Sequence, residues 1–507
     1  MVREWDEEYD VVVVGSAGGA LTGALVAARA GLRTVVVERS GRLGGMASYS
    51  GAALWLPGSR VQERAEAGDS TESARTYLRA LLGEGEAGKR EAFLKEAPAL
   101  VAELEEDPAL AFRHQIFPDY YERPGRVPGG RSIIPENLPV EELGELVSLV
   151  RPPVDLDREG EDHATAPLAG GRALIGRLLL AYDRTGNGAV QVHTRMDEVV
   201  VEDGRAVGIV AVRAGRRVSV RARRGVLLAS GGFEKDAALR AEHGMPGSAA
   251  WSMAPLGTNT GDALRAAVAA GAATTGMGEG WWCPGIAMPD GRAGFLVGFH
   301  GGLVVDASGE RYANESLPYD QFGRQMAAAP GRLPSHAVFD GSGGGRLPAV
   351  TLPSGEPEAH LAAGTWVRAE TVEELARAIG VPEEALAATV SRFNGFADDG
   401  VDKDFGRGED EYARWFGEPV LRPLRTPPYY AARLVLSDLG TKGGLVTDAS
   451  ARVLRGDGTA IEGLYAAGNT TASFTGAHYP GPGVPIGSSM VFGSLAARHM
   501  SGGSAAP

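Results

Sequence analysis

The segment "DVVVVGSAGGALTGALVAARAGLRTVVVE" (residues 10–38) decides the fold of this chain. It opens with a continuous apolar run that ends at Gly15, as in a strand that a parallel sheet buries on both faces. Small and apolar residues follow at helical spacing from Ala20 to Gly31, and a second apolar run ends at Glu38. Strand, helix and strand within about 30 residues predict a βαβ unit.

The turn "GSAGGA" between the first strand and its helix is typical of dinucleotide-binding proteins. In that fingerprint, glycines permit a tight turn and a close approach of pyrophosphate, and an acidic residue after the second strand binds the ribose hydroxyls. This copy departs from the strict pattern, because Ala17 holds the second glycine position and Ala20 the third. The βαβ context and Glu38 favour dinucleotide binding over an ordinary strand–helix turn. The residues predicted to bind the dinucleotide here are Gly15, Ala17, Gly18, Gly19, Glu38 and Arg39.

The next segment, "GRLGGMASYSGAALW" (residues 41–55), places a Gly-Gly pair just past the ribose-binding acid. That pair is typical of flavoproteins rather than of nicotinamide enzymes, and the loop is expected to run along the pyrophosphate toward a flavin. Ser48 and Ser50 are candidate hydrogen-bond donors. The segment has no histidine of the kind to which some flavoproteins attach their cofactor covalently. The predicted contacts are Gly44, Gly45, Ser48, Ser50 and Gly51.

Two later apolar runs also end in glycine: "ASGGFEKD" (residues 229–236) and "GLYAAGN" (residues 463–469). Glycines at such strand ends let the backbone pack against an extended cofactor. The final helix is expected to begin at Gly487, with its amide-rich N-terminus facing the flavin pyrimidine. Four such segments in this order predict FAD, bound non-covalently. The further predicted contacts are Gly231, Gly232, Gly468, Asn469 and Gly487.

Length and periodicity indicate more than one domain, because 507 residues exceed what one compact core holds. Residues 70–105 are helical in pattern, and residues 118–139 are rich in Pro, Gly and Arg and predict a loop. Residues 187–230 alternate with period two and predict a β-meander, with Asp203-Gly204 as one hairpin turn.

The character of the chain changes between about 280 and 440, where aromatic residues, prolines and glycines rise. Helix start signals occur near Thr371 and Pro382. We expect an α/β fold: a Rossmann-type FAD-binding domain with a parallel sheet, helices and a β-meander, formed by residues 1–278 and 442–507. An α+β catalytic domain, residues 279–441, is inserted into it.

Composition excludes several functions. The net charge of −14, with no basic patch, argues against nucleic acid as a partner. Cys283 is the single cysteine, which excludes a disulfide within the chain and fits a cytoplasmic location. No apolar run approaches 18 residues, so we expect no transmembrane segment, while peripheral membrane association stays open. No metal site is predicted, and "DDGVDKD" (residues 398–404) reads as a solvated helix end rather than a calcium loop.

The loop "HYPGPGVPIGSS" (residues 478–489) sets a tyrosine beside alternating glycines and prolines. The prolines stiffen the backbone, and the glycines let it come close to another group. Such a loop can present a phenol hydroxyl and bare backbone amides together.

At this point the chain resembles the 3-ketosteroid Δ1-dehydrogenases, in the larger flavoprotein superfamily that includes fumarate reductase. The stretches that carry the resemblance span nearly the whole chain: "FPDYY" (117–121), "GWWCPG" (280–285), "NESLPYDQFGR" (314–324), "LSDLGTKGGL" (436–445), "GLYAAGN" and "YPGPGVPIG" (479–487). The resemblance implies removal of hydrogens from C1 and C2 of the steroid A ring, beside the C3 ketone. A substrate such as androst-4-ene-3,17-dione is implied. The electron acceptor stays open, with a quinone as one candidate.

The resemblance also implies roles for four residues. Tyr479 and the Gly483 N–H would form an oxyanion clamp on the ketone, with glycine leaving space for the ketone's approach. Tyr319 would take the C2 proton, and Tyr120 would assist it by hydrogen bonding. Adjacent Tyr121 is the alternative to Tyr120. Trp281 and Trp282 could line the steroid cleft or pack in the core.

Three other functions remain to be weighed. A 3-ketosteroid Δ4-(5α)-dehydrogenase would share the flavin segments and the need for an enolising clamp. A fumarate-reductase-like enzyme would need clustered arginine and histidine for two carboxylates, where these motifs offer tyrosines and apolar residues. A non-catalytic protein could keep the dinucleotide fold as a binding scaffold.

Overall fold

The computed structural model describes residues 4–161 and 167–502 and divides into two compact units. Unit 1 comprises residues 1–243, 254–279 and 440–507, and unit 2 comprises residues 244–253 and 280–439. Sequence placed residues 244–253 in the first domain, but they belong to unit 2. None of the helices in the described ranges combines the length and apolar composition that crossing a membrane requires.

The centre of unit 1 is a parallel sheet, as the buried valine runs predict. The parallel strands follow the order β6 (Gly188–Gln191), β2 (Thr34–Val37), β1 (Glu7–Val14), β9 (Arg216–Leu228) and β20 (Ala460–Ala466). Val11 to Val14 are buried, as expected for a central strand of a parallel sheet that is covered on both faces. The α/β class with a parallel sheet is confirmed.

An antiparallel extension adjoins β9. It consists of β7 (Thr194–Glu202) and β8 (Arg205–Arg213), and Asp203 and Gly204 both adopt the positive φ that a tight hairpin turn needs. The meander therefore begins at Thr194 rather than at residue 187, since β6 joins the parallel sheet instead.

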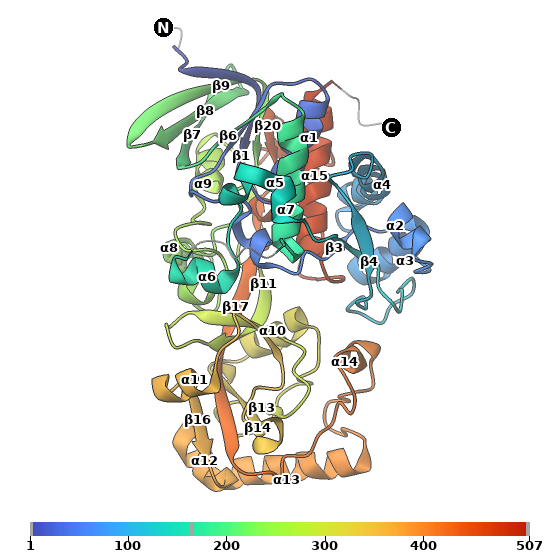
Figure 1. The fold of residues 1–507 in the computed structure, drawn as a ribbon, viewed down its shortest axis with the longest axis vertical. Coiled ribbons are helices and arrows are strands. Elements are labelled where there is room, and N and C mark those ends of the chain that lie inside the picture. Colours follow the sequence, from blue (N-terminus) through green and yellow to red (C-terminus); the bar gives the residue numbers. More distant parts are fainter. Residues whose placement is uncertain (1–3, 162–166, 503–507) are drawn as a thin grey trace. The chain divides into compact units, whose positions relative to one another are not determined.

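Three helices dominate unit 1 and lie side by side in Figure 1: α1 (Gly18–Arg29), α7 (Gly170–Arg184) and α15 (Val484–Met500). Glycines let α1 and α15 approach closely. A Cβ on Gly19 would lie 2.5 Å from the Ser489 carbonyl oxygen, and one on Gly493 would lie 2.2 Å from the Gly19 carbonyl oxygen. Helix α15 starts three residues before the predicted Gly487, because Pro485 fits its first turn.

A small three-stranded sheet follows the order β3 (Leu54–Trp55), β5 (Ser132–Pro135) and β4 (Phe112–Gln115). Residues 118–139 were predicted to be loop, so β5 corrects that expectation; its short "SIIP" sequence lies inside a Pro/Gly-rich stretch. The helical pattern of residues 70–105 is confirmed by α3 (Thr71–Leu82) and α4 (Ala87–Leu104). Ser70 caps α3 by accepting from the Ser73 N–H.

The remaining elements of unit 1 are short. The helices are α2 (Arg60–Arg64), α5 (Val140–Leu143), α6 (Val154–Glu159), α8 (Ala237–Glu242) and α9 (Asp262–Ala269), and the strands are β10 (Thr274–Thr275), β18 (Gly444–Leu445) and β19 (Arg452–Leu454).

Unit 2 is built on a seven-stranded sheet. Its order is β13 (Leu303–Val305), β14 (Ser335–Asp340), β17 (Tyr429–Thr441, to Leu439 in this unit), β11 (Gly280–Ala287), β12 (Ala293–Val297) and β15 (Val350–Leu352), and β16 (Trp366–Ala369) pairs with β17. Helices α10 (Tyr319–Ala327), α11 (Pro357–Ala363), α12 (Val372–Ile379), α13 (Glu383–Asp399) and α14 (Glu411–Trp415) complete it.

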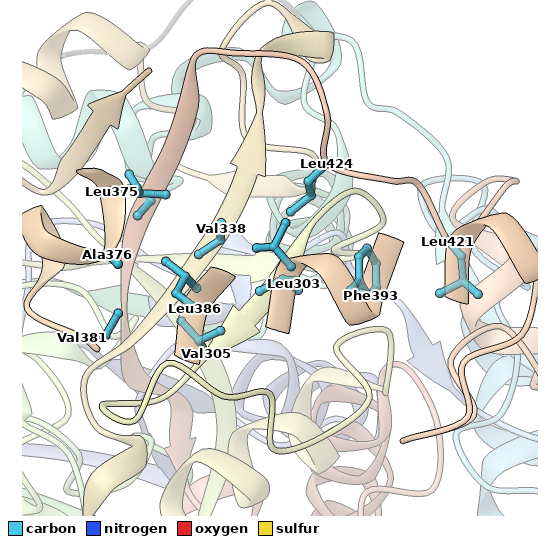
Figure 2. Close-up of a cluster of buried hydrophobic side chains, with 12 residues drawn as sticks. Leu303, Val305, Val338, Leu375, Ala376, Val381, Leu386, Phe393, Leu421 and Leu424 are labelled. Atoms are coloured by element: carbon cyan, nitrogen blue, oxygen red, sulfur yellow. The ribbon is translucent and has the colours of Figure 1, made fainter. Parts of the chain in front are cut away.

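The core of unit 2 joins two of these helices to the sheet. Figure 2 shows Leu375 of α12 and Leu386 of α13 packed with Val305 and Val338 of the strands. The helix starts predicted near Thr371 and Pro382 are confirmed, with the Thr371 side chain accepting from the Glu374 N–H.

Candidate active site

The carboxyl ends of β1 and β2 meet beside the N-terminus of α1. Gly15 has φ +100°, and a Cβ there would lie 2.4 Å from the Ala229 carbonyl oxygen, so only glycine fits. The buried Glu38 carboxylate accepts from the Ser16 hydroxyl at 2.7 Å and from the Ser40 N–H at 2.8 Å. The Gly44 N–H donates to Ser16 Oγ at 3.0 Å, which ties the Gly-Gly loop to the first turn. An ionised carboxylate has about four acceptor sites, so Glu38 keeps capacity for a ribose hydroxyl.

The N-terminus of α1 has no side-chain cap. Its N-cap residue is Ala17, with φ −80° and ψ −176°, whose methyl side chain cannot accept from the first-turn N–H groups. Those amides carry the positive end of the helix dipole and suit a phosphate. Ala17 adopts backbone angles that any residue can adopt, so glycine is not required there.

The two serines of the loop after β2 were predicted to donate hydrogen bonds to the cofactor, but in the structure both contact carbonyl groups of the loop itself. The Ser50 hydroxyl donates to the Ala47 carbonyl at 2.7 Å, so its one proton is used inside the loop. The buried Ser48 hydroxyl has a long contact of 3.5 Å with the Leu43 carbonyl. Gly45 and Gly51 have no heavy atom within 4 Å of where a Cβ would stand, so this side of the loop is open for a ligand.

The other predicted glycines have packing roles as well. A Cβ on Gly231 would meet the Asn259 amide at 2.2 Å, and one on Gly232 would meet Thr441 Oγ1. A Cβ on Gly468 would lie 2.7 Å from Ser489 Oγ, and the neighbouring Asn469 amide lies against Gly440. Gly487 presses against the backbone of Trp55. Thr470 Oγ1 links two of the segments by donating to the Gly231 carbonyl and accepting from the Ser230 N–H.

Arg39 lies at the edge of this region. Its guanidinium forms an ion pair with Asp262 at 3.1 Å and also contacts Thr260. Arg39 therefore joins the end of β2 to the start of α9, and its predicted contact with the dinucleotide stays a prediction. Taken together, an uncapped helix N-terminus, an acid with spare acceptor sites and an open glycine loop fit an FAD molecule.

The loop before α15 is held in place through its backbone carbonyl groups, which accept hydrogen bonds from residues of other segments. The Pro480 carbonyl accepts from the Tyr77 hydroxyl at 2.7 Å and from the Tyr120 N–H at 2.9 Å. The Pro482 carbonyl accepts from the Ser132 hydroxyl at 2.6 Å. At the start of the loop, the buried Lys442 ammonium donates to the His478 carbonyl. The backbone is therefore fixed at three points.

Gly483 is the N-cap of α15 and has φ +89°. A Cβ at this position would lie 2.2 Å from the Ala53 carbonyl oxygen. The backbone before β3 therefore already demands glycine at this position, and the expectation that glycine also leaves space for a ketone stays a prediction. Within the described ranges, no acceptor of the chain takes the Gly483 N–H, while its carbonyl accepts from the Gly487 N–H at 2.9 Å.

Tyr120 and Tyr479 come together in unit 1. Their rings meet edge to face with centroids 5.2 Å apart, and both side chains are buried. Tyr121 instead places its ring against His478, so the two adjacent tyrosines have different neighbours. Asp119 of the same motif is buried and accepts from Trp55 Nε1 at 2.8 Å and Arg131 Nε at 2.9 Å.

Tyr319 belongs to unit 2, where it is the first residue of α10 and is mostly buried. Its ring meets Phe295 of β12 edge to face, with centroids 5.1 Å apart. It also lines a small hollow whose other lining residues are apolar except Glu315. The expected hydrogen bond between Tyr120 and Tyr319 stays a prediction.

Glu315 belongs to a buried network of four charges. Arg311 pairs with Glu315 at 2.7 Å and with Asp402 at 2.8 Å, and Arg407 lies 3.3 Å from Glu315. Burial opposes ionisation of Asp402, but its hydrogen bonds with Arg311 hold its pKa below the ordinary value. The segment 398–404 is therefore not wholly solvated as expected, because Asp402 turns inward. In the described residues, no group of three histidine, cysteine or acidic side chains could hold a metal ion.

The "GWWCPG" residues lie on β11. Trp281, Trp282 and Cys283 are buried, and a Cβ on Gly323 of α10 would meet the Trp282 backbone at 3.0 Å. Trp282 thus packs in the interface between α10 and β11. Burial raises the pKa of the Cys283 thiol well above its ordinary range, so this thiol is unreactive.

Sequence reasoning missed the supports of the Tyr479 loop. Tyr77 lies in a stretch that reads only as an amphipathic helix, and Ser132 lies in one that reads as loop. They contact Pro480 and Pro482 across 403 and 350 residues of sequence. The available signal was compositional: a tyrosine on the apolar face of a helix, and a serine next to Arg131 in an otherwise apolar run.

Comparisons with known proteins identify the relatives of this chain. A family model described as FAD binding domain matches residues 10–486. The chain is 41% identical to a 3-oxosteroid 1-dehydrogenase of Rhodococcus opacus, over 98% of this chain and 100% of the relative. It is 37% identical to a 4-oxocyclohexanecarboxylate 2-dehydrogenase of Sinomonas cyclohexanicum, over 97% and 93%. The solved 3-ketosteroid Δ1-dehydrogenase from Sterolibacterium denitrificans, in complex with 1,4-androstadiene-3,17-dione, matches with a TM-score of 0.89 and 32% identity, over 98% of this chain and 100% of that one.

Proposed function

This chain belongs to the FAD-binding flavoprotein family and, within it, to the 3-oxosteroid 1-dehydrogenases, and from this we propose how its residues bring about the reaction. It is an FAD-dependent oxidoreductase that introduces a C1–C2 double bond into the A ring of a 3-ketosteroid. The observation that supports this mechanism is the loop that follows Tyr479: buried donors fix its Pro480 and Pro482 carbonyls, and the Gly483 N–H has no acceptor within the described chain.

The reaction requires that the C–H bond at C2 become more acidic. A hydrogen on C2, next to the C3 ketone, leaves as a proton only when the charge that develops on the ketone oxygen is stabilised. We propose that the Tyr479 hydroxyl and the Gly483 N–H donate to that oxygen. One such donor typically lowers the barrier by about 3–4 kcal/mol, and a donor fixed in advance costs no reorganisation.

Tyr319 takes the C2 proton in this proposal. A phenol has an ordinary pKa of about 10 and is a weak base at neutral pH, so its anion must be favoured by a neighbouring donor. Tyr120 is the proposed donor, on the strength of the "PDYY" motif. FAD, when bound, accepts the hydride that leaves C1.

The cofactor would be held by residues of unit 1. Glu38 would bind the ribose hydroxyls, the first-turn amides of α1 would bind the pyrophosphate, and the open loop at Gly45 and Gly51 would run along it. Non-covalent binding remains our proposal, and a quinone is the proposed oxidant that restores the flavin.

A second substrate class follows from the 37% identical relative, which is named for 4-oxocyclohexanecarboxylate. The chemistry beside a cyclic ketone would be the same, but this substrate carries a carboxylate that needs a cation. The hollow beside Tyr319 offers apolar side chains and one carboxylate, Glu315, which Arg311 and Arg407 already hold. The apolar side chains next to Tyr319 therefore favour a neutral substrate over a carboxylate at this tyrosine.

Anaerobic mixing tests this proposal. Purified holoprotein is mixed with androst-4-ene-3,17-dione or with 4-oxocyclohexanecarboxylate, and flavin absorbance and products are followed. We expect the steroid to bleach the flavin in a single turnover, with a 1,4-diene as product. Faster bleaching by the cyclohexane acid would overturn the substrate assignment. With 5α-androstane-3,17-dione as a further steroid, formation of a C4–C5 double bond in place of a C1–C2 double bond would favour the Δ4 reaction. A colourless protein that gains no flavin absorbance when FAD is added would favour the alternative of a non-catalytic binding protein with a dinucleotide-binding fold.

A further inference from the structure

The backbone from Pro480 to Gly483 is held from one side by buried side chains of distant segments. Tyr77 of α3 donates to the Pro480 carbonyl, and Ser132 of β5 donates to the Pro482 carbonyl. Both donors are fully buried. The loop is thus anchored by two hydroxyls for which the proposed reaction has no chemical use.

The Ser132 contact bears directly on the clamp, because the Pro482 carbonyl and the Gly483 N–H belong to the same peptide group. That peptide is trans, and a trans peptide is planar, so its N–H points opposite to its C=O. By fixing the carbonyl at 2.6 Å, Ser132 fixes the direction of the N–H. A rotation of this peptide would turn the amide away from any ketone and bring the carbonyl lone pairs toward it.

Ser132 is itself rigidly placed. It lies in the central strand of the small sheet, opposite Trp55 of β3 and Gln115 of β4. The Trp55 N–H in turn donates to the Gly483 carbonyl at 3.2 Å, so the peptides on both sides of Gly483 are held by the same sheet. Strand positions hold a side chain more accurately than loop positions.

Tyr77 holds the preceding segment in the same way. Its ring lies under the Arg131 guanidinium, 5.5 Å from the centroid, and Arg131 forms buried ion pairs with Asp69 at 2.8 Å and Asp119 at 2.9 Å. Burial, and then the charge of Asp119, raise the pKa of Tyr77 above its ordinary value, so the hydroxyl stays a donor. The Asp119 that precedes Tyr120 thereby connects the "PDYY" motif to the loop.

We propose that Ser132 is a positioning residue that orients the Gly483 N–H toward the substrate ketone, and that Tyr77 supports it from the Pro480 carbonyl. The inference rests on the proposed role of the Gly483 N–H as a donor to the ketone oxygen. It goes beyond that role by assigning the amide's orientation to a side chain 350 residues away in sequence.

The test uses the holoprotein and the variants Ser132→Ala, Ser132→Thr and Tyr77→Phe. Tyr182→Phe is the matched control, because Tyr182 is equally buried and its hydroxyl bonds Thr34 Oγ1 at 2.6 Å, away from the loop. The first readout is hydrogen–deuterium exchange of peptides covering residues 477–487. The second is the rate of flavin reduction by androst-4-ene-3,17-dione at several concentrations, in the wild-type and Tyr479→Phe backgrounds.

We expect Ser132→Ala and Tyr77→Phe to raise exchange in the 477–487 peptides, while Tyr182→Phe and Ser132→Thr leave it near the wild-type level. Ser132→Ala should slow flavin reduction about tenfold with little change in steroid affinity, since a buried carbonyl loses its donor. In the Tyr479→Phe background the further loss should be below about threefold, because donors that act on one oxygen are not additive.

Unchanged loop exchange in Ser132→Ala, or faster exchange with a normal reduction rate, would overturn the inference. An equal slowing in both backgrounds would also overturn it, because it would indicate a general loss of stability. If the wild type itself is not reduced by any 3-ketosteroid, the proposed function fails, whereas the exchange readout still decides whether Ser132 holds the loop.

Discussion

The rings of Tyr120 and Tyr479 meet edge to face, with centroids 5.2 Å apart and an interplanar angle of 68°. The Tyr120 N–H also donates to the carbonyl of Pro480, the residue that follows Tyr479. Two motifs that are far apart in the sequence thus pack against each other in unit 1. A substitution that removes either ring would disturb the other, so tyrosine-to-phenylalanine changes are the informative ones.

Tyr319→Phe should stop proton removal while the protein keeps its FAD, because the ring and its contact with Phe295 remain and only the hydroxyl is lost. The measurement is exchange of the C2 hydrogen in heavy water, together with turnover. Tyr312→Phe is the control, since Tyr312 is a buried tyrosine of unit 2 whose hydroxyl bonds Ser335 at 2.8 Å. Turnover of Tyr319→Phe near the wild-type rate would mean that another residue is the base.

Gly483→Ala should destabilise the protein as well as slow it. A methyl group there would lie 2.2 Å from the Ala53 carbonyl at φ +89°, so the backbone before β3 must move. Gly476→Ala is the matched control, because it has φ +53° and nothing within 4 Å of its Cβ. The control should lose about 1–2 kcal/mol from backbone strain alone, and Gly483→Ala clearly more. Equal melting temperatures of the two variants would contradict this account.

Ala17→Gly should leave FAD content and affinity nearly unchanged. Ala17 already has N-cap angles open to any residue, and the first-turn amides of α1 are the same in both proteins. The check is the ratio of flavin to protein absorbance and a titration of the apoprotein with FAD. A large rise in FAD affinity would show that the methyl group crowds the phosphate.

His336 should make the stability of unit 2 depend on pH. Burial, followed by the charge of Arg433, lowers its pKa to about 4, whereas an unfolded histidine titrates near 6.5. As the pH falls below 6.5, the unfolded state binds a proton that the folded state refuses, so stability decreases. His336 should account for about 2 kcal/mol of the loss between pH 7 and 5. His336→Gln should lack that part, whereas His360, whose pKa burial also lowers, contributes in both proteins. Denaturant curves at both pH values test this, and an equal loss in both proteins would contradict it.

The sequence predicts more of the fold than of the candidate site. The valine runs ending at Gly15 and Glu38, the period-two stretch with Asp203-Gly204 and the Thr371 cap are local signals, and the structure contains the elements they predict. Strand β5 was missed because its pairing partners lie in other segments, so a short apolar run between glycines and prolines reads as loop. The start of α15 at Val484 was within reach, since Pro485 favours a first helical turn.

The residues of the site also fall into those that local sequence patterns predict and those that depend on long-range contacts. Glu38 and the glycine turn follow from a local pattern, whereas Ser132 and Tyr77 act through contacts that span most of the chain. The reason for Gly483 was also inaccessible from sequence, because it depends on the backbone of Ala53 lying next to it. Long-range packing of this kind leaves no spacing pattern to recognise.

The most direct test of the account compares flavin reduction in the wild type and in Tyr479→Phe by rapid anaerobic mixing at several steroid concentrations. The variant keeps the ring that contacts Tyr120 and loses only the hydroxyl, so steroid affinity should change little. The reduction rate should fall by about 10²–10³-fold, the typical cost of one oxyanion donor, because the clamp acts mainly as charge builds on the ketone oxygen. If Tyr479→Phe binds steroid more weakly but reduces the flavin at the normal rate once saturated, Tyr479 is only a wall of the pocket and the oxyanion clamp is contradicted.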